Sequence, residues 1–262
     1  MPLLDVEGFP LHYLDEGQGL PVLLFHAYPL GAEQFRPQLE ALSGRFRFLV
    51  PDGRGFGLSG EADGPTEMTR LARDGLALLD ALGIEQAVVG GVSMGGYAAL
   101  ALVREDASRV KGLVLSDTQA RADSPEARQG RQAAAETAET QGPEAVLAAM
   151  LPKLVAASAS DEVKDAIATL IRQARPSGIA AAQRGMALRH DARELLARFS
   201  GPSLIVVGDQ DAITPPDVAR GLADLVPGSR LEVIAGAGHL PNLERPEAFN
   251  AALASFLEAL QG

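Results

Sequence analysis

The sequence predicts an α/β fold, with a mostly parallel twisted β-sheet, helices on both faces and a helical insertion. Short apolar runs alternate with segments of helical periodicity over the first 118 residues, and again from residue 200. Between them, residues 119–199 are rich in alanine and show no strand pattern. Such alternation is typical of parallel sheets, because each connection between parallel strands usually contains a helix. We therefore predict a core domain, 1–118 with 200–262, and a helical lid at 119–199.

The strands are predicted from apolar runs, many of them β-branched. The run PVLLFH is continuous rather than alternating, as expected for a parallel strand buried on both faces. Strands are expected at LLDVEG and PLHYLDEG, and then at 21–26, 46–52, 87–91, 110–117, 203–209 and 231–238. The insertion follows the strand at 110–117, so it starts at the sheet edge where ligands bind in such folds. This placement is why we expect it to act as a lid.

The helices are predicted from apolar residues that recur every three or four positions. Helices are expected at 33–43, 66–82, 94–104 and about 215–225. A final helix places five apolar side chains on one face, namely Phe249, Leu253, Phe256, Leu257 and Leu260.

Composition excludes several kinds of site and partner. The 262 residues include no cysteine, which excludes disulfides and thiolate metal sites. The formal net charge of −11 argues against nucleic acid or an anionic membrane as a partner. The first residues, MPLLDVEGFP, lack the basic start and apolar run of a signal peptide, and no stretch reaches the length of a membrane span. We expect a cytoplasmic protein, a monomer or homo-oligomer.

One serine stands out at a predicted strand-to-helix corner. Gly91-Val92-Ser93-Met94-Gly95 matches the pattern G-x-S-x-G. A sharp turn there holds the serine in a strained conformation and lifts its hydroxyl clear of the sheet. The glycines at 91 and 95 are needed because the turn brings these two positions close together. The start of the following helix directs free N–H groups toward the same point, which favours a developing negative charge.

A serine hydroxyl needs a base, and the base needs an orienting acid. Of the four histidines, His239 follows the last predicted strand and therefore shares the carboxyl edge of the sheet with Ser93. The loop after the preceding strand offers two acids, Asp211 and Asp209, and Asp117 after the strand LVLS is a third candidate. We expect His12 and His190 to be surface or packing residues.

Six motifs in order identify a family resemblance: FHAYP, PDGRGFGLS, GVSMGG, LVLSD, VVGDQDAITP and AGAGHLPNLERPEAF. The chain resembles α/β-hydrolases of the lid-bearing esterase and 3-oxoadipate enol-lactonase type. The resemblance implies that Ser93 is the nucleophile, His239 the general base and Asp211 the orienting acid. It implies an oxyanion hole made by the backbone N–H groups of Met94 and Tyr28.

The loop before Tyr28 departs from the family pattern. The family usually has His-Gly where this chain has His26-Ala27. Alanine has less conformational freedom than glycine, so we expect the oxyanion loop to be set slightly differently. His26 itself is expected to brace this loop.

Three other patterns are rejected as functional signals. The G-x-G-x-x-G at 55–60 is followed by a loop rather than a helix, unlike a dinucleotide site. Asp209-Gln210-Asp211 lacks the glycine and glutamate of a calcium loop. The charged residues of 119–140 have the spacing of a solvated helix face. One of them, Arg121, is a weaker candidate for contact with a substrate carboxylate.

The expected function is hydrolysis of a small carboxylic ester or lactone, with no metal and no organic cofactor. Peroxide chemistry of the perhydrolase or haloperoxidase type, and hydrolysis of a C–C bond, use the same three residues and stay open. A ligand-binding receptor on a hydrolase scaffold is the alternative from another functional class. An aspartate in place of Ser93 would have favoured dehalogenases or epoxide hydrolases.

Overall fold

The computed structural model describes residues 2–261 and confirms the predicted α/β fold class. Eight strands form a single sheet in the order β1-β2-β4-β3-β5-β6-β7-β8. The pairs β1–β2 and β2–β4 are antiparallel, and every other neighbouring pair is parallel. The strands are β1 (Leu3–Val6), β2 (Phe9–Glu16), β3 (Leu20–Phe25), β4 (Phe46–Pro51), β5 (Ala87–Val92), β6 (Val110–Ser116), β7 (Ser203–Gly208) and β8 (Arg230–Ile234).

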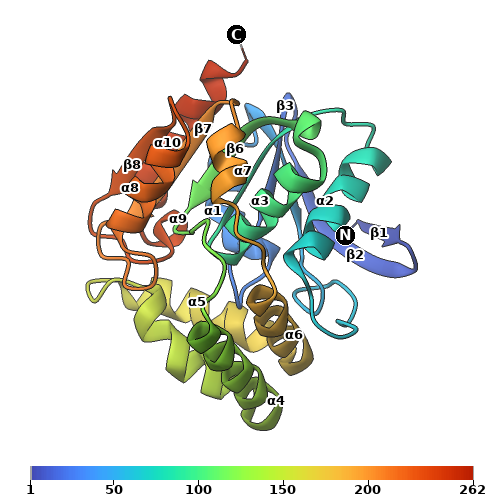
Figure 1. Ribbon diagram of the computed structural model, residues 1–262, viewed down its shortest axis with the longest axis vertical. Coiled ribbons are helices and arrows are strands. Elements are labelled where there is room, and N and C mark those ends of the chain that lie inside the picture. Colours follow the sequence, from blue (N-terminus) through green and yellow to red (C-terminus); the bar gives the residue numbers. More distant parts are fainter. Residues whose placement is uncertain (1, 262) are drawn as a thin grey trace.

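Helices lie on both sides of this sheet (Figure 1). In the chain outside the insertion, α2 packs against α3 and α1 packs against α10. These helices are α1 (Arg36–Leu42), α2 (Met68–Ala81), α3 (Met94–Asp106), α8 (Pro216–Leu225), α9 (Pro241–Glu244) and α10 (Pro246–Ala259). Short turns of tighter helix occur at η1 (Ala32–Phe35) and η2 (Ala107–Arg109).

Four helices stand between β6 and β7 in the chain, as the sequence predicts. They are α4 (Pro125–Leu154), α5 (Asp161–Gln173), α6 (Pro176–Ala187) and α7 (Arg193–Arg198). The first three lie together beyond one end of the sheet (Figure 1). The long α4 is interrupted at Gly142, whose φ of 76° is non-helical and which precedes a proline. That this segment acts as a lid stays a prediction.

The central strands are buried and parallel, and their shared direction determines the edge where the site forms. All six residues of β5 and all six of β7 are buried. Because β5, β6, β7 and β8 run parallel, their carboxyl ends meet at one edge of the sheet. Ser93 follows β5, Asp117 follows β6, and the loops after β7 and β8 hold Asp211 and His239.

One predicted strand was too long. The apolar run at 231–238 was expected to be extended throughout, whereas β8 ends at Ile234. Gly236 adopts a φ of 70°, so the chain turns there and carries His239 back toward the sheet edge.

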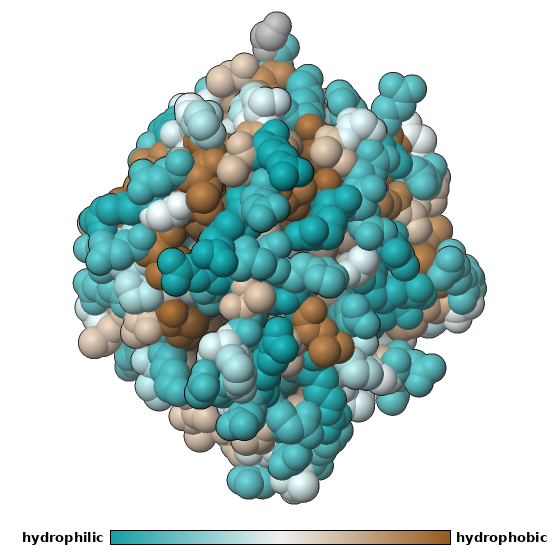
Figure 2. All heavy atoms as spheres, in the orientation of Figure 1, coloured by the Kyte–Doolittle hydropathy of each residue, from teal (hydrophilic) through white to brown (hydrophobic). Residues whose placement is uncertain are grey.

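The surface in view is mainly hydrophilic. The face drawn in Figure 2 is covered mainly by hydrophilic residues, with hydrophobic ones in small groups between them. Across residues 2–261, no helix combines the length and apolar character needed to cross a membrane. The cytoplasmic location stays a prediction.

Candidate active site

Ser93 occupies a strained turn between β5 and α3. Its φ of 55° lies in the left-handed region that residues with a side chain rarely adopt. The neighbouring strand holds this conformation: the Ser93 N–H donates to the Ser116 carbonyl at 2.8 Å. The Thr118 hydroxyl donates to the Ser93 carbonyl, also at 2.8 Å. The strain is therefore maintained by backbone contacts with β6 and its following loop.

The flanking glycines are required by space. A Cβ placed on Gly91 would overlap the backbone of Gly95, and a Cβ on Gly95 would overlap the Phe25 carbonyl at the end of β3. The same packing brings the start of α3 against the loop that follows β3 and begins with His26. The turn that holds Ser93 and the predicted oxyanion loop are therefore in direct contact.

The structure brings Ser93, His239 and Asp211 into one hydrogen-bonded line. His239 Nε2 is 2.8 Å from Ser93 Oγ, and His239 Nδ1 is 2.8 Å from Asp211 Oδ2. An ionised carboxylate can only accept, so Nδ1 carries the ring proton and donates to Asp211. Nε2 is then free to accept the proton of the Ser93 hydroxyl. His239 is 1% exposed, whereas Ser93 is partly exposed, so the serine end of the line is the end that solvent reaches.

Asp211 is held in its ionised form. Its Oδ1 accepts the N–H groups of Ile213 and Thr214, and its Oδ2 accepts the Thr214 hydroxyl as well as His239. Burial works against the charged form. The bonds from His239 and Thr214 outweigh it, so the pKa of Asp211 lies well below its ordinary value.

The structure distinguishes Asp211 from the other two candidate acids. Asp209 accepts the Gly236 N–H at 2.8 Å on the exposed side of its loop, and it makes no hydrogen bond to His239. Asp117 is completely buried near Asp211, but it accepts only the Ser116 hydroxyl and the Gly208 N–H. Burial, together with the charge of Asp211, raises the pKa of Asp117 well above its ordinary value. Of these two neighbouring carboxyls, Asp211 is therefore favoured in its charged form, whereas burial opposes the charged form of Asp117.

This assignment predicts a specific pH dependence of stability. Above about pH 4, the folded chain keeps the Asp117 proton that the unfolded chain releases. The free energy of unfolding therefore falls as the pH rises from about 4 toward the raised pKa. Asp117→Asn has no such proton, and asparagine tolerates the φ of 47° at this position. We expect urea unfolding to show the variant gaining stability relative to wild type as pH rises; parallel pH profiles would contradict this.

The N–H groups predicted to form the oxyanion hole are available. Among the described residues, neither the Met94 nor the Tyr28 N–H donates to another protein group. Met94 is the first residue of α3, so its N–H also has the positive end of the helix dipole behind it. Met94 directly follows Ser93, and Tyr28 lies in the loop after β3, which packs against the Ser93 turn.

His26 is hydrogen-bonded on both sides of its ring beside the predicted oxyanion loop. Its Nε2 accepts the Gly53 N–H at 2.9 Å, so its Nδ1 carries the proton and donates to the Ala27 carbonyl, also at 2.9 Å. Burial lowers the pKa of His26, which keeps the ring neutral in this role. Ala27 does not occupy the positive-φ region, so alanine replaces the usual glycine without backbone strain.

Two buried polar residues support the site and were not found from the sequence. The Gln34 side chain accepts the Ala27 N–H at 2.7 Å and contacts Asn242 near the His239 loop. Glu244 accepts the N–H of Gly238 at 2.8 Å and that of Ala156, at the end of α4, at 2.7 Å. The only signal in the sequence was position. Glu244 lies within the family motif AGAGHLPNLERPEAF, and Gln34 lies a few residues after the motif FHAYP.

Two other sequence expectations can be compared with the structure. His190 is exposed and His12 is a buried packing residue that bonds Asp52 through Nδ1 at 2.7 Å, as expected for surface or packing histidines. The expectation for the charged run at 119–140 was partly wrong: it is not uniformly a solvated face, because the Asp123 side chain is 5% exposed and pairs with Arg131. Arg121 itself is exposed.

Three side chains at the site are of the kinds that bind metal ions, but each is already hydrogen-bonded to the protein. Donor atoms of Asp117, Asp211 and His239 lie within 4.8 Å of one another. Each of these side chains already makes hydrogen bonds to protein groups, and burial raises the pKa of Asp117, which disfavours its charged, metal-binding form. This saturation favours a proton relay over a cation site; the absence of a metal stays a prediction.

Known proteins match the whole chain. A family model described as alpha/beta hydrolase fold matches residues 21–246. The malate-bound structure of a thermophilic esterase from Thermogutta terrifontis is 41% identical, with a TM-score of 0.95, over 97% of this chain and 95% of that chain. The enol-lactonase from Burkholderia xenovorans LB400 is 31% identical, with a TM-score of 0.91, over 98% of this chain and 100% of that chain.

Curated sequences give the same result. The 3-oxoadipate enol-lactonase 1 of Acinetobacter baylyi is 30% identical over 249 residues, which is 93% of this chain and 91% of that protein. The chain belongs to the α/β-hydrolase fold family. Within that family it is an enzyme of the hydrolase class, similar to esterases and enol-lactonases.

Proposed function

We propose that this protein hydrolyses small carboxylic esters or lactones through a covalent acyl-enzyme on Ser93. The observation that carries the proposal is the unbroken line from Ser93 Oγ through His239 to Asp211, with both hydrogen bonds at 2.8 Å. A hydroxyl next to a neutral imidazole that is oriented by a carboxylate is the arrangement that activates serine as a nucleophile.

The first half of the reaction forms the acyl-enzyme. Ser93 Oγ attacks the carbonyl carbon while His239 Nε2 takes the hydroxyl proton. Asp211 stabilises the resulting imidazolium without accepting its proton. His239 then protonates the leaving alkoxide as the bond to the carbonyl carbon breaks. For a lactone, the leaving oxygen stays attached to the acyl group.

The second half releases the acid. His239 takes a proton from water, the hydroxide attacks the ester carbon, and Ser93 leaves with the proton that His239 returns. In both halves the carbonyl oxygen becomes an oxyanion. The N–H groups of Met94 and Tyr28 would stabilise it, each contributing about 3 kcal/mol by comparison with a single lost donor in other hydrolases.

The names of the relatives support the substrate class. The solved relatives include an esterase and an enol-lactonase, and the curated one is an enol-lactonase. An enol-lactone is therefore our favoured substrate subclass. Perhydrolase or haloperoxidase chemistry and C–C bond hydrolysis use the same three residues and stay predictions.

We further propose that residues 119–199 act as a lid on this site. The end of α4 is tied to the histidine loop, because the His239 N–H donates to the Leu154 carbonyl at 3.1 Å. The Ala156 N–H donates to the buried Glu244 carboxylate a few residues further along. Movement of α4 would therefore be transmitted to His239, as expected for a lid that gates turnover.

A panel of neutral short-chain esters and small lactones tests the proposed function. We expect wild type to hydrolyse both kinds without added metal or cofactor, and Ser93→Ala to hydrolyse neither. A wild-type protein that is inert on the whole panel would overturn the proposal. So would equal rates for the two proteins. Either of these outcomes would favour a receptor built on a hydrolase scaffold.

A further inference from the structure

The loop after β4 contains the G-x-G-x-x-G pattern at 55–60, and in the structure this loop encloses a buried carboxylate. Asp52, the first residue after β4, is 3% exposed. Gly57 has a φ of 48°, and a Cβ placed on it would lie 2.0 Å from Asp52 Oδ2. The Leu58 N–H donates to the same oxygen at 3.0 Å. The glycine pattern that does not fit a dinucleotide site therefore makes room for Asp52.

Asp52 is paired with a histidine of the neighbouring strand β2. His12 Nδ1 is 2.7 Å from Asp52 Oδ2, and the His12 side chain is 4% exposed. Within residues 2–261, His12 Nε2 is buried and has no hydrogen-bond partner. A proton on Nε2 would be a buried donor without an acceptor, so the arrangement favours a neutral ring with its proton on Nδ1. His12 then gives the carboxylate one hydrogen bond and no positive charge.

The Asp52 carboxylate is ionised despite its burial. Burial opposes the charged form, but the hydrogen bonds that Asp52 accepts from His12 and from two backbone N–H groups outweigh it. The pKa of Asp52 therefore lies below its ordinary value. A charged acceptor makes stronger hydrogen bonds than a neutral one, so the N–H groups that meet this carboxylate are held firmly.

Asp52 and the residue after it bind both ends of the predicted oxyanion loop. Asp52 Oδ1 accepts the Ala32 N–H at 2.6 Å, at the end of that loop. The Gly53 N–H donates to His26 Nε2 at 2.9 Å, at its beginning. Tyr28, whose backbone N–H is the predicted oxyanion donor, lies between these two points in the chain. The position of that N–H therefore depends on the end of β4.

The loop and the carboxylate are in close contact. A Cβ placed on Gly31 would lie 2.9 Å from Asp52 Oδ1. The Gly31 backbone is extended, with a φ of −150°, which any residue can adopt. Glycine at this position is therefore explained by the space that the carboxylate occupies.

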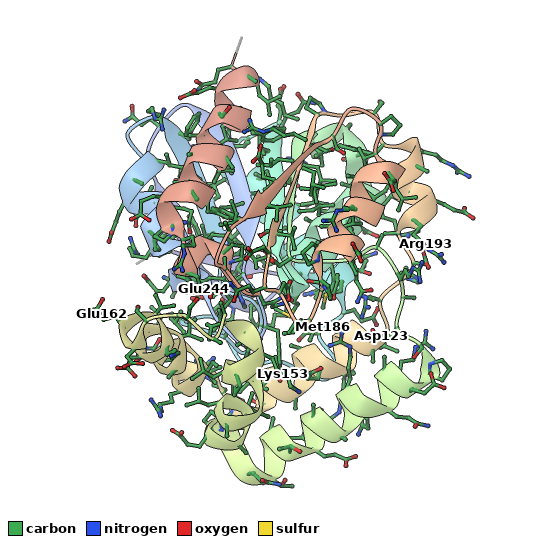
Figure 3. The ribbon with its side chains drawn as sticks, turned by 90° about the vertical axis from the view of Figure 1, so that its left-hand side faces the viewer. Asp123, Lys153, Glu162, Met186, Arg193 and Glu244 are labelled. Atoms are coloured by element: carbon green, nitrogen blue, oxygen red, sulfur yellow. The ribbon has the colours of Figure 1, made fainter. Side chains whose placement is uncertain are left out.

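The outer side of the loop after β4 packs against the insertion. A Cβ on Gly178, in α6, would lie 2.3 Å from the Gly55 carbonyl oxygen, so the two backbones touch. Further along the chain, the Thr66 N–H donates to the Ala181 carbonyl at 3.0 Å. Figure 3 labels Met186, near the end of α6, at this boundary between the insertion and the sheet. The loop after β4 is therefore held between α6 and the predicted oxyanion loop.

We propose that Asp52 is a positioning residue of this hydrolase. Through the Ala32 N–H, its carboxylate sets where the Tyr28 N–H lies relative to the developing oxyanion. His12 orients that carboxylate. The inference rests on the proposed function, because an oxyanion forms only when Ser93 attacks a carbonyl carbon. Both Asp52 and His12 act through the loop and not on the substrate itself.

Two substitutions at His12 test the proposal kinetically. Asparagine can present its NH₂ group near the place of His12 Nδ1, whereas leucine has no donor. We expect His12→Leu to lower kcat for a chromogenic acetate ester by about 10-fold to 100-fold with little change in KM. A displaced oxyanion donor weakens binding of the transition state and not of the substrate. His12→Asn should restore most of the loss, because Nε2 makes no hydrogen bond that asparagine would give up.

A trifluoromethyl ketone tests the oxyanion hole directly. Ser93 Oγ adds to its carbonyl carbon, the serine proton passes to His239, and the carbonyl oxygen becomes an oxyanion. We expect Ki in His12→Leu to rise by the same factor by which kcat/KM falls. Merely unfolded enzyme would instead lower the number of reactive sites, which titration with a fluorophosphonate counts.

Asp15→Asn is the matched control. Asp15 also joins β2 to β4, where it accepts Arg47 Nε and Nη2 at 2.8 and 2.7 Å, but it contacts neither Asp52 nor the predicted oxyanion loop. We expect its kcat and Ki to stay within about threefold of the wild type. Unchanged kcat and Ki in His12→Leu would overturn the inference while leaving the proposed function intact. An equal loss in His12→Asn would also overturn it, because lost packing alone predicts that result.

Gly31→Ala provides the decision if His12→Leu does not fold. It removes no buried polar group, and its added methyl should push the Ala32 N–H away from Asp52 Oδ1. We expect kcat to fall by about 10-fold or more with KM little changed. A wild-type kcat in Gly31→Ala would contradict the inference.

Hydrogen exchange separates failure of this inference from failure of the proposed function, because it needs no turnover. The Ala32 amide donates to Asp52, so it should exchange at least about tenfold faster in His12→Leu than in wild type or His12→Asn. Equal exchange in all three proteins would contradict the inference, whether or not the wild type hydrolyses any ester.

Discussion

Ser93→Ala is expected to lower kcat for any ester that the wild type hydrolyses by roughly four to six orders of magnitude. The methyl group cannot attack a carbonyl, and the 2.8 Å hydrogen bond to His239 is lost. The free N–H groups of Met94 and Tyr28 remain, so a small residual rate above that in water is expected. Initial rates with a chromogenic acetate ester measure the loss. A variant within tenfold of the wild type would contradict the nucleophile assignment.

Ser93→Gly separates the loss of the hydroxyl from the loss of backbone strain. Both variants lack the nucleophile, but only glycine adopts the φ of 55° without strain. We expect Ser93→Gly to be more stable to unfolding than Ser93→Ala, by about 1 kcal/mol, and equally inactive. Urea unfolding of the two proteins gives the comparison, and an equal or lower stability for the glycine variant would argue against strain at this turn.

Asp211→Asn is expected to lower kcat by about four orders of magnitude, by comparison with the same change in other triads. The asparagine amide can present its NH₂ group to His239 Nδ1. The ring proton then moves to Nε2, where it blocks acceptance of the Ser93 proton. The carboxylate also accepts three bonds from its own loop, so the variant should lose stability as well.

Asp209→Asn provides the matched control for this experiment. It makes the same chemical change two residues away, where the carboxylate accepts the Gly236 N–H and faces solvent. We expect its kcat to stay within about threefold of the wild type. If Asp117 were the orienting acid instead, Asp117→Asn would abolish turnover and Asp211→Asn would not.

The sequence predicted the parts of this site that depend on local geometry. The spacing of Gly91, Ser93 and Gly95 predicts a tight turn within five residues, and the structure contains that turn. The β/α alternation predicted that the strand ends meet at one edge, because parallel strands leave no other arrangement.

The residue pattern alone could not choose among three carboxylates near that edge, and only the family resemblance favoured Asp211. Asp117, Asp209 and Asp211 all follow strands, and which one reaches His239 depends on loop conformations a few residues long. The choice follows from the hydrogen bonds each acid receives, which are tertiary contacts. The spacing of a solvated helix face likewise did not indicate that Arg131 pairs with Asp123, whose side chain is 5% exposed.

Mapping a fluorophosphonate label by mass spectrometry tests the central claim most directly. Attack on phosphorus by an activated serine releases fluoride and leaves a stable covalent adduct, so the measurement does not depend on knowing the substrate. The account predicts a single adduct, on the peptide that contains Ser93, which is lost when His239 is replaced by glutamine. An adduct on another residue, or undiminished labelling of Ser93 in His239→Gln, would contradict it.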